Sequence, residues 1–561
     1  MMRVADYIAS FLKKKNINDI FMLTGYGAMY INDAIKLAGI KYYATRNEAT
    51  APIMASSYSK IKNKIGVACV TAGPGATNAI PGLAEAFVDS SSILVISGQV
   101  DFNHTTYSTK SNTIRTFGTA EINIIPIVKP LTKYCAILKN PNDVRFILEK
   151  AFYLSTTGRP GPVWIDIPLN VQKAIIKPNL LRKFLILKKV KKNLTFKIDR
   201  DIKKIINLLK VSKKPLLVFG NGVKQNQLNK RIKSLIGKIK IPFIFTRFTN
   251  DLISHDNKFA MGLGGIKGSR FCKKIMEEAD LVISFGCRFS PQFVGHDFSA
   301  FASAKVVAID IDKDELNKKG QKIDLKLNYD LNFFFPRFVK KIKNLKEKYS
   351  TWIEHCSKLK KNNDMLIEKR NPIDLYYFMN KLGELSNKNN ILITDAGSNY
   401  YVGGQVWKFK KRQKEIASVS NAAMGLSIPL AIGAAVASPN SNILAVTGDG
   451  SLELNIQELK TISHYRFNIK LFVINNGGYV SMHNWADTFF KGRRLDTPED
   501  TGDGTLNLKN IAKAFDLQHY LIKDFKKINS DVKKILRLRG PLFIEVITDS
   551  RQKIFDAFKD K

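Results

Sequence analysis

A strand, a glycine turn, a helix and a second strand follow one another over residues 442–476, and this order constrains the fold most strongly. The segment reads NILAVTGDGSLELNIQELKTISHYRFNIKLFVINN, with apolar runs at both ends and an aspartate between Gly448 and Gly450. A right-handed crossover that joins two parallel strands through a helix takes about 30 residues, which this segment matches. The sequence therefore predicts an α/β fold with a parallel sheet.

The same alternation of strands and helices recurs along the rest of the chain. Strands are predicted within 40–46, 92–100, 214–223, 241–248, 279–289, 305–312, 390–400 and 540–549. The 561 residues are three to four times the length of one average domain of ~150 residues. We predict three doubly wound parallel-sheet domains over residues 1–175, 195–340 and 370–550, with a charged helical connector over 338–372.

The charge balance raises the question of a nucleic-acid partner. The chain has 89 Lys and Arg against 48 Asp and Glu, a formal net charge of +41. The lysines are spread along the whole chain, however, and the basic runs at 181–193 and 200–214 are typical of a solvated linker and of an amphipathic helix face. We therefore predict a lysine-rich bias without a nucleic-acid site, although such a surface could attract anionic substrates.

The cysteines and the apolar stretches of the sequence predict a cytoplasmic location. The five cysteines are odd in number, widely spaced and without a CxxC pair, which is typical of reduced thiols in a cytoplasmic protein. The first 15 residues predict an amphipathic helix and no targeting segment. The most apolar stretch, 421–437, contains Gly, Ser and Pro, and predicts a buried loop and helix with no membrane contact.

Polar side chains follow the two strands of the 442–476 crossover. Asp449 ends the first strand, and Asn476 ends the second, 27 residues later. Because the carboxyl ends of neighbouring parallel strands meet at one edge of the sheet, the carboxylate and the amide oxygen are expected to converge there. Such oxygens suit Mg²⁺, and the flanking glycines let backbone approach a phosphate. The alternative is a simple turn and a strand-end loop, which the spacing and context disfavour.

The GDGS and NN segments resemble the thiamine-diphosphate motif. Residues 3–550 as a whole resemble the acetolactate synthase-like branch of thiamine-diphosphate enzymes. The likeness is carried by TAGPGATN (71–78), DSSSILVISGQV (89–100), KPLTKY (129–134), GRPGPVWIDIPLNVQ (158–172), SNAAMGLSIPLAIGAA (420–435) and INNGGYVSMHNWADTFF (474–490). The resemblance implies pyrimidine-binding, central and diphosphate-binding domains, and a homodimer or homotetramer with shared active sites.

The resemblance also implies roles for individual residues. Glu48 matches the glutamate that hydrogen-bonds the aminopyrimidine ring and promotes proton removal from the cofactor; its alternative role is that of an acidic residue at a helix start. Asp449, Asn476 and the carbonyl of Gly478 match the Mg²⁺ ligands. The residues that match contacts to thiamine diphosphate are Thr71, Gly73, Asn78, Gly397, Ser398, Asn399, Ala422, Met424, Gly448, Gly450 and Ser451. Met424 is alternatively a gap-filling core residue.

The chain lacks a histidine pair that the simple decarboxylases of the family have, and this difference bears on the reaction. Those enzymes place a pair of histidines in the first domain, where this chain has only His104. The resemblance therefore favours carboligation, in which pyruvate is decarboxylated and the acyl unit is transferred to a second 2-oxo acid. The resemblance also implies that Tyr26, Lys133 and Trp485 lie at positions that face substrate; Trp485 is alternatively a core-anchoring indole.

Several departures leave the acceptor open. A Phe-Gln-Glu segment of the family reads Thr119, Ala120 and Glu121 here, and Asn47 replaces a histidine before Glu48. The alternatives are acetyl transfer to a keto-sugar nucleotide, or another lyase or oxidase activity on the same scaffold. Whether a regulatory subunit binds is also left open.

The central domain resembles the one that binds FAD in acetolactate synthases. The matching positions are Gly220, Gly222, Thr246, Gly286, Arg288 and Asp310. A Gly-Asn-Gly turn alone is weak support for a dinucleotide. Ser290, Pro291 and Gln292 replace an Asp-Asp-Arg stretch of the family, so the resemblance leaves FAD open, as a structural group in this reaction class.

Overall fold

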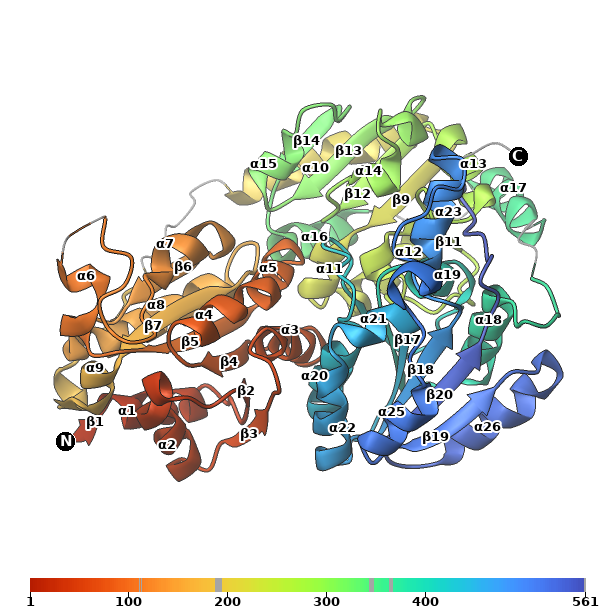
Figure 1. Cartoon of the computed structure of the whole chain (residues 1–561). Coiled ribbons are helices and arrows are strands. Elements are labelled where there is room, and N and C mark those ends of the chain that lie inside the picture. The colour runs from red at the N-terminus through yellow and green to blue at the C-terminus, as the bar shows by residue number, and fades with distance from the viewer. Residues whose placement is uncertain (110, 112, 187–193, 343–347, 363–366, 559–561) are drawn as a thin grey trace.

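Most strands in the described part of the chain form three six-stranded sheets, and helices cover them (Figure 1). The structure, a computed structural model, describes residues 1–109, 111, 113–186, 194–342, 348–362 and 367–558. All neighbouring strands within these three sheets run parallel. The predicted class, three doubly wound α/β domains, is confirmed.

The first domain is built on a sheet of order β3-β2-β4-β5-β7-β6. Its strands are β2 (Asp19–Met22), β3 (Lys41–Ala44), β4 (Gly66–Val70), β5 (Ile93–Gln99), β6 (Tyr134–Ile137) and β7 (Val163–Pro168). Its helices are α1 (Val4–Lys14), α2 (Met29–Leu37), α3 (Thr50–Lys62), α4 (Pro74–Asn78), α5 (Ile80–Val88), α6 (Thr106–Thr109), α7 (Ile124–Val128), α8 (Val144–Thr156) and α9 (Leu169–Lys173). A short antiparallel pair, β1 (Met2–Arg3) and β8 (Ile175–Ile176), joins its two ends.

The central domain has the order β11-β10-β9-β12-β13-β14. Its strands are β9 (Pro215–Phe219), β10 (Phe243–Phe245), β11 (Ala260–Leu263), β12 (Leu281–Phe285), β13 (Lys305–Asp310) and β14 (Leu325–Asn328). Its helices are α10 (Leu194–Val211), α11 (Asn221–Gln225), α12 (Asn229–Ile239), α13 (Arg270–Glu278), α14 (Pro291–Val294), α15 (Lys313–Leu316), α16 (Leu331–Lys341) and α17 (Ser350–Lys361). The amphipathic helix predicted at 200–214 is α10; the basic run at 181–193 lies partly outside the described residues.

The third domain has the order β16-β15-β17-β18-β20-β19. Its strands are β15 (Asn390–Thr394), β16 (Lys414–Ala417), β17 (Asn442–Gly448), β18 (Ile469–Asn475), β19 (Gln518–Ile522) and β20 (Leu542–Ile547). Its helices are α18 (Leu375–Leu385), α19 (Ser398–Val406), α20 (Ser427–Ala437), α21 (Asp449–Glu453), α22 (Leu459–Tyr465), α23 (Val480–Phe489), α24 (Pro498–Thr501), α25 (Leu508–Ala514) and α26 (Ile528–Arg537). The crossover predicted at 442–476 is β17, α21, α22 and β18.

Each sheet separates two apolar cores because successive side chains of a strand point to opposite faces. In β4, Val67 and Cys69 pack into one core, and Ala68 and Val70 into the other. One of these cores continues into the third domain, since α3 and α20 lie side by side between the two sheets. All residues of α20 are buried, which confirms the helix predicted within 421–437.

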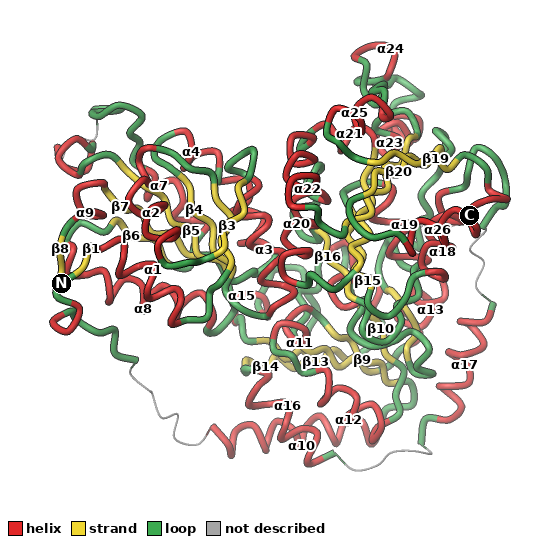
Figure 2. The backbone as a smooth tube through the Cα atoms, turned by 90° about the horizontal axis from the view of Figure 1, so that it is seen from below, coloured by secondary structure: helices red, strands yellow, loops and turns green. Residues whose placement is uncertain are grey.

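The strand orders define where ligands are expected to bind. In an open α/β sheet, the crevice lies at the carboxyl edge where the strand order reverses. This point falls between β2 and β4, between β9 and β12, and between β15 and β17. Figure 2 shows the three sheets as separate groups of strands around a common junction.

Two expectations concern the chain as a whole. The five cysteines, Cys69, Cys135, Cys272, Cys287 and Cys356, are all free thiols. In the part of the chain that the structure describes, no helix is both long and apolar enough to span a bilayer.

Candidate functional site

Asp449 is the centre of a turn formed where β17 and β18 end. Its Oδ2 accepts the backbone N–H groups of Asn476, Gly477 and Gly478 at 2.9, 2.9 and 3.2 Å, and its Oδ1 accepts that of Gly450 at 3.0 Å. Burial raises the pKa of this carboxyl, and the four N–H groups oppose that rise. The two strand ends meet as the crossover predicts, while metal binding by these residues stays a prediction.

Glycines leave open space beside this turn. Among the described residues, a Cβ on Gly448 would meet no atom within 4 Å, and one on Gly397 would meet only the Ser481 hydroxyl, at 3.5 Å. Gly397 follows β15, and Gly448 ends its neighbour β17, so both lie at the point where the strand order reverses. Open backbone next to carboxylate and amide oxygens fits a diphosphate held with Mg²⁺.

Asp395 ties the surrounding segments together. Its Oδ2 accepts hydrogen bonds from the Thr447 hydroxyl at 2.9 Å and from the Ser427 N–H at 3.2 Å, and its N–H donates to Asn399 Oδ1 at 3.0 Å. Burial raises the pKa of Asp395 to about 6. Ser398 and Asn399 open α19 and are both buried. The ends of β15 and β17 and the start of α20 are thereby held in one arrangement.

The loop between β16 and α20 carries two predicted cofactor contacts, Ala422 and Met424. Both are half-buried, and Ala422 has a φ of +52°, a left-handed conformation that is unusual for a residue with a side chain. The third predicted contact nearby, Ser451, is buried on α21. The structure thus brings these residues to the same edge of the third sheet.

The sequence analysis missed a second carboxylate at the Asp449 turn. Asp503 comes from the loop after α24, and its Oδ2 accepts the Tyr479 N–H at 2.7 Å. Burial and the nearby Asp449 raise the pKa of Asp503 to about 6. A Cβ on Gly450 or Gly478 would collide with this carboxylate. The sequence Gly502-Asp503-Gly504 repeats the GDG pattern, which is the signal that could have found it.

Gly478→Ala is expected to weaken Mg²⁺-dependent binding of thiamine diphosphate by about 10-fold. Gly478 has a φ of +85°, which costs about 1–2 kcal/mol with a side chain, and the new Cβ would push the Asp503 carboxylate away. Gly540→Ala is a matched control, because Gly540 has the same φ and no described atom lies within 4 Å of its Cβ position. Calorimetric titration measures both variants; equal binding by both would contradict this role of the turn.

Glu48 lies in the loop between β3 and α3 of the first domain. The helix expected from about Glu48 begins at Thr50. Glu48 Oε2 accepts the Asn78 side-chain amide at 3.2 Å, and a Cβ on Gly75 would lie 3.4 Å from Glu48 Oε1 and in collision with Thr71. Three residues predicted for the pyrimidine side, Glu48, Thr71 and Asn78, are therefore together.

The fourth first-domain residue, Gly73, has a φ of +54°, and a Cβ there would collide with the carbonyl oxygen of Ala120. Only glycine therefore lets the turn after β4 approach the loop that carries Ala120.

A carboxylate of the third domain holds the Glu48 loop. Glu458 Oε1 accepts the Arg46 N–H at 2.7 Å and the Thr50 hydroxyl at 2.8 Å, and Glu458 and Thr50 are both fully buried. Within the described residues of one chain, Glu48 and Asp449 share no hydrogen bond or ion pair. The group around Glu48 and the group around Asp449 thus lie on two different domains.

Three stretches of the chain match the three domains of one group of enzymes. Residues 2–119 match the N-terminal TPP binding domain of thiamine pyrophosphate enzymes, 202–336 their central domain, and 395–546 their C-terminal TPP binding domain. The first match contains Glu48, and the last contains Asp449 and Asn476. The chain belongs to the thiamine pyrophosphate enzyme family.

Three relatives of this chain are described as acetolactate synthases or as their probable or established large subunits. The chain is 30% identical to the acetolactate synthase large subunit of Lactococcus lactis subsp. lactis, over 97% of this chain and 92% of the relative. It is 28% identical to a probable acetolactate synthase large subunit of Methanococcus aeolicus, over 98% and 92%. It is also 28% identical to acetolactate synthase 1, chloroplastic, of Nicotiana tabacum, over 99% and 84%. It is a thiamine-diphosphate (thiamine pyrophosphate) enzyme of the acetolactate synthase type.

The residues predicted to face substrate have different surroundings in this thiamine pyrophosphate enzyme. Tyr26 and Trp485 are 71% and 63% exposed in the single chain. Lys133 is half-buried, and its Nζ donates to the carbonyl oxygens of Thr157 and Arg159 at 2.5 and 2.7 Å. These bonds give Lys133 a structural role in the loop before β7, and the substrate role of all three residues stays a prediction.

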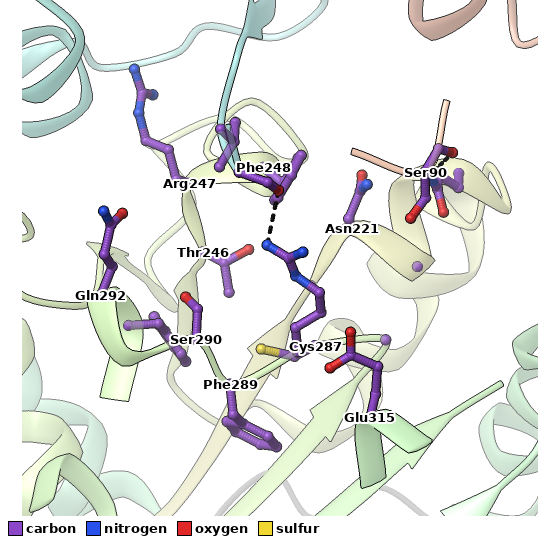
Figure 3. Close-up of a pocket in the computed structure, with 18 of the residues that line it drawn as sticks. Ser90, Asn221, Thr246, Arg247, Phe248, Cys287, Phe289, Ser290, Gln292 and Glu315 are labelled. Carbon is purple, nitrogen blue, oxygen red and sulfur yellow. Dashed lines mark hydrogen bonds between the residues drawn. The ribbon is translucent and has the colours of Figure 1, made fainter. Parts of the chain in front are cut away.

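The six residues predicted for FAD line a single cavity of about 360 Å³ at the reversal point of the central sheet (Figure 3): Gly220, Gly222, Thr246, Gly286, Arg288 and Asp310. Gly220 and Gly286 meet so closely that a Cβ on Gly220 would collide with the carbonyl of Gly286. Ser90 of the first domain and Tyr400 of the third also line this cavity. It is therefore a junction of all three domains.

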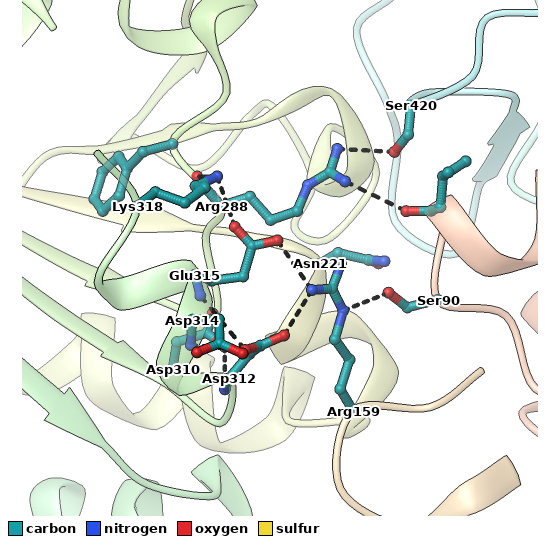
Figure 4. Close-up of polar contacts among 12 residues, drawn as sticks. Ser90, Arg159, Asn221, Arg288, Asp310, Asp312, Asp314, Glu315, Lys318 and Ser420 are labelled. Atoms are coloured by element: carbon teal, nitrogen blue, oxygen red, sulfur yellow. Dashed lines mark hydrogen bonds and ion pairs between the residues drawn. The ribbon is translucent and has the colours of Figure 1, made fainter. Parts of the chain in front are cut away.

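Arginines bridge the domains at this junction (Figure 4). Arg159 of the first domain pairs with Asp312 and Glu315 of the central domain at 2.8 and 2.9 Å. Arg288 of the central domain donates to the Ser420 hydroxyl of the third at 2.8 Å. The polar contacts around the cavity thus fix the relative placement of the domains.

A buried charge cluster lies beside the junction. Lys60 Nζ is 2.8 Å from Asp89 Oδ2 and 3.9 Å from Glu85 Oε1, and both acidic residues are 1% exposed. Burial and the charge of Asp89 raise the pKa of Glu85 to about 7. Burial raises and Lys60 lowers the pKa of Asp89, with a net downward shift. One lysine faces two carboxyl groups, and the pKa values of these two groups move in opposite directions.

Glu85→Gln is expected to raise the thermal midpoint at pH 8 and to leave it nearly unchanged at pH 5. The pKa of Glu85 rises from 4.5 to about 7 on folding, so the folded chain holds a proton that the unfolded chain has lost. Stability therefore falls as pH rises through this window, by about 1.4 kcal/mol per unit, and a glutamine does not titrate. Thermal melts of both proteins measure this, and an equal difference at both pH values would refute it.

Proposed function

We propose that the enzyme uses thiamine diphosphate and Mg²⁺ to decarboxylate pyruvate and to transfer the acyl unit to a second 2-oxo acid. The observation that carries this proposal is the Asp449 turn, with open glycine backbone beside it at the reversal point of the third sheet. The description of the relatives as acetolactate synthases supports the substrate and the reaction.

The chain's own residues have separate tasks in this proposal. The Asp449 carboxylate, the Asn476 amide oxygen and the Gly478 carbonyl hold Mg²⁺. The diphosphate lies against Gly397, Ser398, Asn399, Gly448, Gly450 and Ser451. When bound, thiamine diphosphate supplies a carbanion that reacts with 2-oxo acids.

On the pyrimidine side, the Glu48 carboxyl holds a proton at a ring nitrogen. The Ala422 carbonyl and the Met424 N–H hydrogen-bond the aminopyrimidine, and Thr71, Gly73 and Asn78 form the wall of this part of the site. Tyr26, Lys133 and Trp485 are the proposed substrate contacts.

A keto-sugar nucleotide is the alternative acceptor. Thr119 and Ala120 stand where the family segment has phenylalanine and glutamine, and this departure keeps the choice of acceptor open. The test follows CO₂ release from pyruvate with and without an added keto-sugar nucleotide. Unchanged release supports the 2-oxo acid acceptor, whereas acceleration with consumption of the sugar nucleotide supports the alternative.

We also propose a homodimer or homotetramer in which one chain supplies the Glu48 group and another the Asp449 group. The separation of these groups on two domains supports this, as do the exposed apolar side chains near each group: Tyr26, Met29 and Phe117 in the first domain, and Met482, Trp485 and Phe490 in the third.

Mixing an inactive Glu48→Gln protein with an inactive Asp449→Ala protein, with subunit exchange, tests this arrangement. In a mixed dimer with shared sites, one of two sites has both intact residues, so activity is expected to return to about one quarter of wild type. Sites contained within single chains would give no activity on mixing.

The junction cavity is the proposed site for FAD. Among the described residues, Arg288 makes no ion pair, and its guanidinium lines a cavity with close backbone at Gly220 and Gly286, which suits a diphosphate group. The absorbance spectrum of the purified enzyme after denaturation tests this: a released flavin supports FAD, and its absence after reconstitution with FAD contradicts it.

A further inference from the structure

We propose that Asp89 and Glu85 are positioning residues for the loop that carries Ala422 and Met424. Both acidic residues lie at the C-terminal end of α5 in the first domain, whereas the loop belongs to the third domain. The inference rests on the proposed cofactor contacts of this loop. It assigns to the buried charge cluster a role in placing these contacts.

Each carboxylate contacts the start of the loop. Asp89 Oδ1 accepts the Ser420 N–H at 3.1 Å, and Glu85 Oε2 accepts the Ser418 hydroxyl at 2.7 Å. Arg288 adds a third anchor, because it donates to the Ser420 hydroxyl at 2.8 Å. Ala422 follows Ser420 by only two residues, so little chain remains to absorb a displacement of these anchors.

The conformation of the loop requires anchors on both sides. Ala422 has a φ of +52°, and such a residue keeps a left-handed conformation only where the surroundings determine it. On the downstream side, Asn455 donates to the Gly425 carbonyl at 2.8 Å, and Asp395 accepts the Ser427 N–H at 3.2 Å. On the upstream side, Glu85 and Asp89 have the corresponding role.

The composition of the cluster also indicates a positioning role. Burying Glu85 and Asp89 beside the half-buried Lys60 is costly, and Glu85 Oε1 has no hydrogen-bond partner among the described residues. An apolar set of side chains would fill the same space without that cost. It would not accept hydrogen bonds from Ser418 and Ser420, which is what the carboxylates do.

The test compares Asp89→Ala, Asp89→Asn and Asp201→Ala in the full-length enzyme. Asp201 is a matched control, because it is also buried and accepts a hydrogen bond, from the Tyr329 hydroxyl at 2.7 Å, but lies in the central domain. The two readouts are the calorimetric affinity for thiamine diphosphate with Mg²⁺ and the hydrogen exchange of the backbone over residues 418–426.

Asp89→Ala is expected to weaken thiamine diphosphate binding about 10-fold or more and to speed exchange over 418–426. Asp89→Asn keeps an acceptor oxygen, so its thiamine diphosphate affinity and its exchange over 418–426 are expected to stay close to those of wild type. Asp201→Ala is expected to change neither the affinity nor the exchange. Ser418→Ala removes only the bond to Glu85 and serves if Asp89→Ala does not fold; it is expected to shift both readouts in the same direction.

Met424→Ala separates the two proposals. If it weakens thiamine diphosphate binding while the Asp89 and Ser418 variants alter neither readout, the positioning role is wrong and the cofactor contacts of the loop stand. If the Asp89 and Ser418 variants speed exchange over 418–426 but leave thiamine diphosphate affinity unchanged, the cluster anchors a loop that does not contact the cofactor. The proposed contacts of the loop are then wrong, and the positioning role is overturned with them.

Discussion

Asp449→Ala is expected to weaken Mg²⁺-dependent binding of thiamine diphosphate by at least about 100-fold. The substitution removes a carboxylate that is a proposed metal ligand and also accepts four backbone N–H groups. Without this carboxylate, only the Asn476 amide and the Gly478 carbonyl remain of the three proposed Mg²⁺ ligands. The turn that carries these two residues also loses the hydrogen bonds that hold it. Calorimetric titration with and without Mg²⁺ measures the effect.

Asp503→Asn is the control for this prediction. Asp503 is the other carboxylate at the same turn, and asparagine keeps an oxygen that can accept the Tyr479 N–H. It is expected to retain Mg²⁺-dependent binding, since Asp503 is not among the proposed ligands. Loss of binding in Asp503→Asn together with normal affinity in Asp449→Ala would reverse the assignment.

Glu48→Gln is expected to lower turnover by about 10²–10⁴-fold and to leave thiamine diphosphate affinity within a few-fold of wild type. Glutamine has the size of glutamate and keeps an oxygen that can accept the Asn78 amide, so the loop remains in place. It cannot hold a proton at the pyrimidine nitrogen, and only the chemical step is affected. Steady-state turnover and calorimetric affinity are measured on the same preparation.

Glu149→Gln is a suitable comparison for Glu48→Gln. Glu149 lies on α8 of the same domain, where its carboxylate pairs with Arg145 at 2.9 Å, away from the Glu48 loop. Its turnover is expected to match that of wild type. If Glu48→Gln also turned over at the wild-type rate, Glu48 would have no part in the chemistry.

The elements that sequence analysis can predict are those in which local pattern and tertiary role agree. The crossover of β17 and β18 is predictable because its apolar runs, its glycine turn and their spacing lie within one continuous segment. The convergence of Asp449 and Asn476 follows from that topology alone. The buried helix α20 is predictable because all but a few of its residues are apolar.

Contacts between distant segments were not predictable in the same way. Asp503 reaches the Asp449 turn from a separate loop, and the sequence around Asp449 does not predict this contact. Lys133 fits a family motif, yet its ammonium donates to two backbone carbonyls of the loop before β7. The sequence does not predict this contact, because the loop is distant along the chain. The contacts of Asp89 and Glu85 with the Ser418–Ser420 segment likewise depend on how two domains pack.

The ratio of products formed from pyruvate alone tests the proposed carboligation most directly. The wild-type enzyme is incubated with thiamine diphosphate, Mg²⁺ and pyruvate, and CO₂ and acetolactate are measured over time. Two pyruvate molecules that yield one CO₂ and one acetolactate would establish pyruvate as both donor and acceptor, as proposed. CO₂ release with little acetolactate would contradict pyruvate as the acceptor, and no CO₂ at all would contradict pyruvate as the donor.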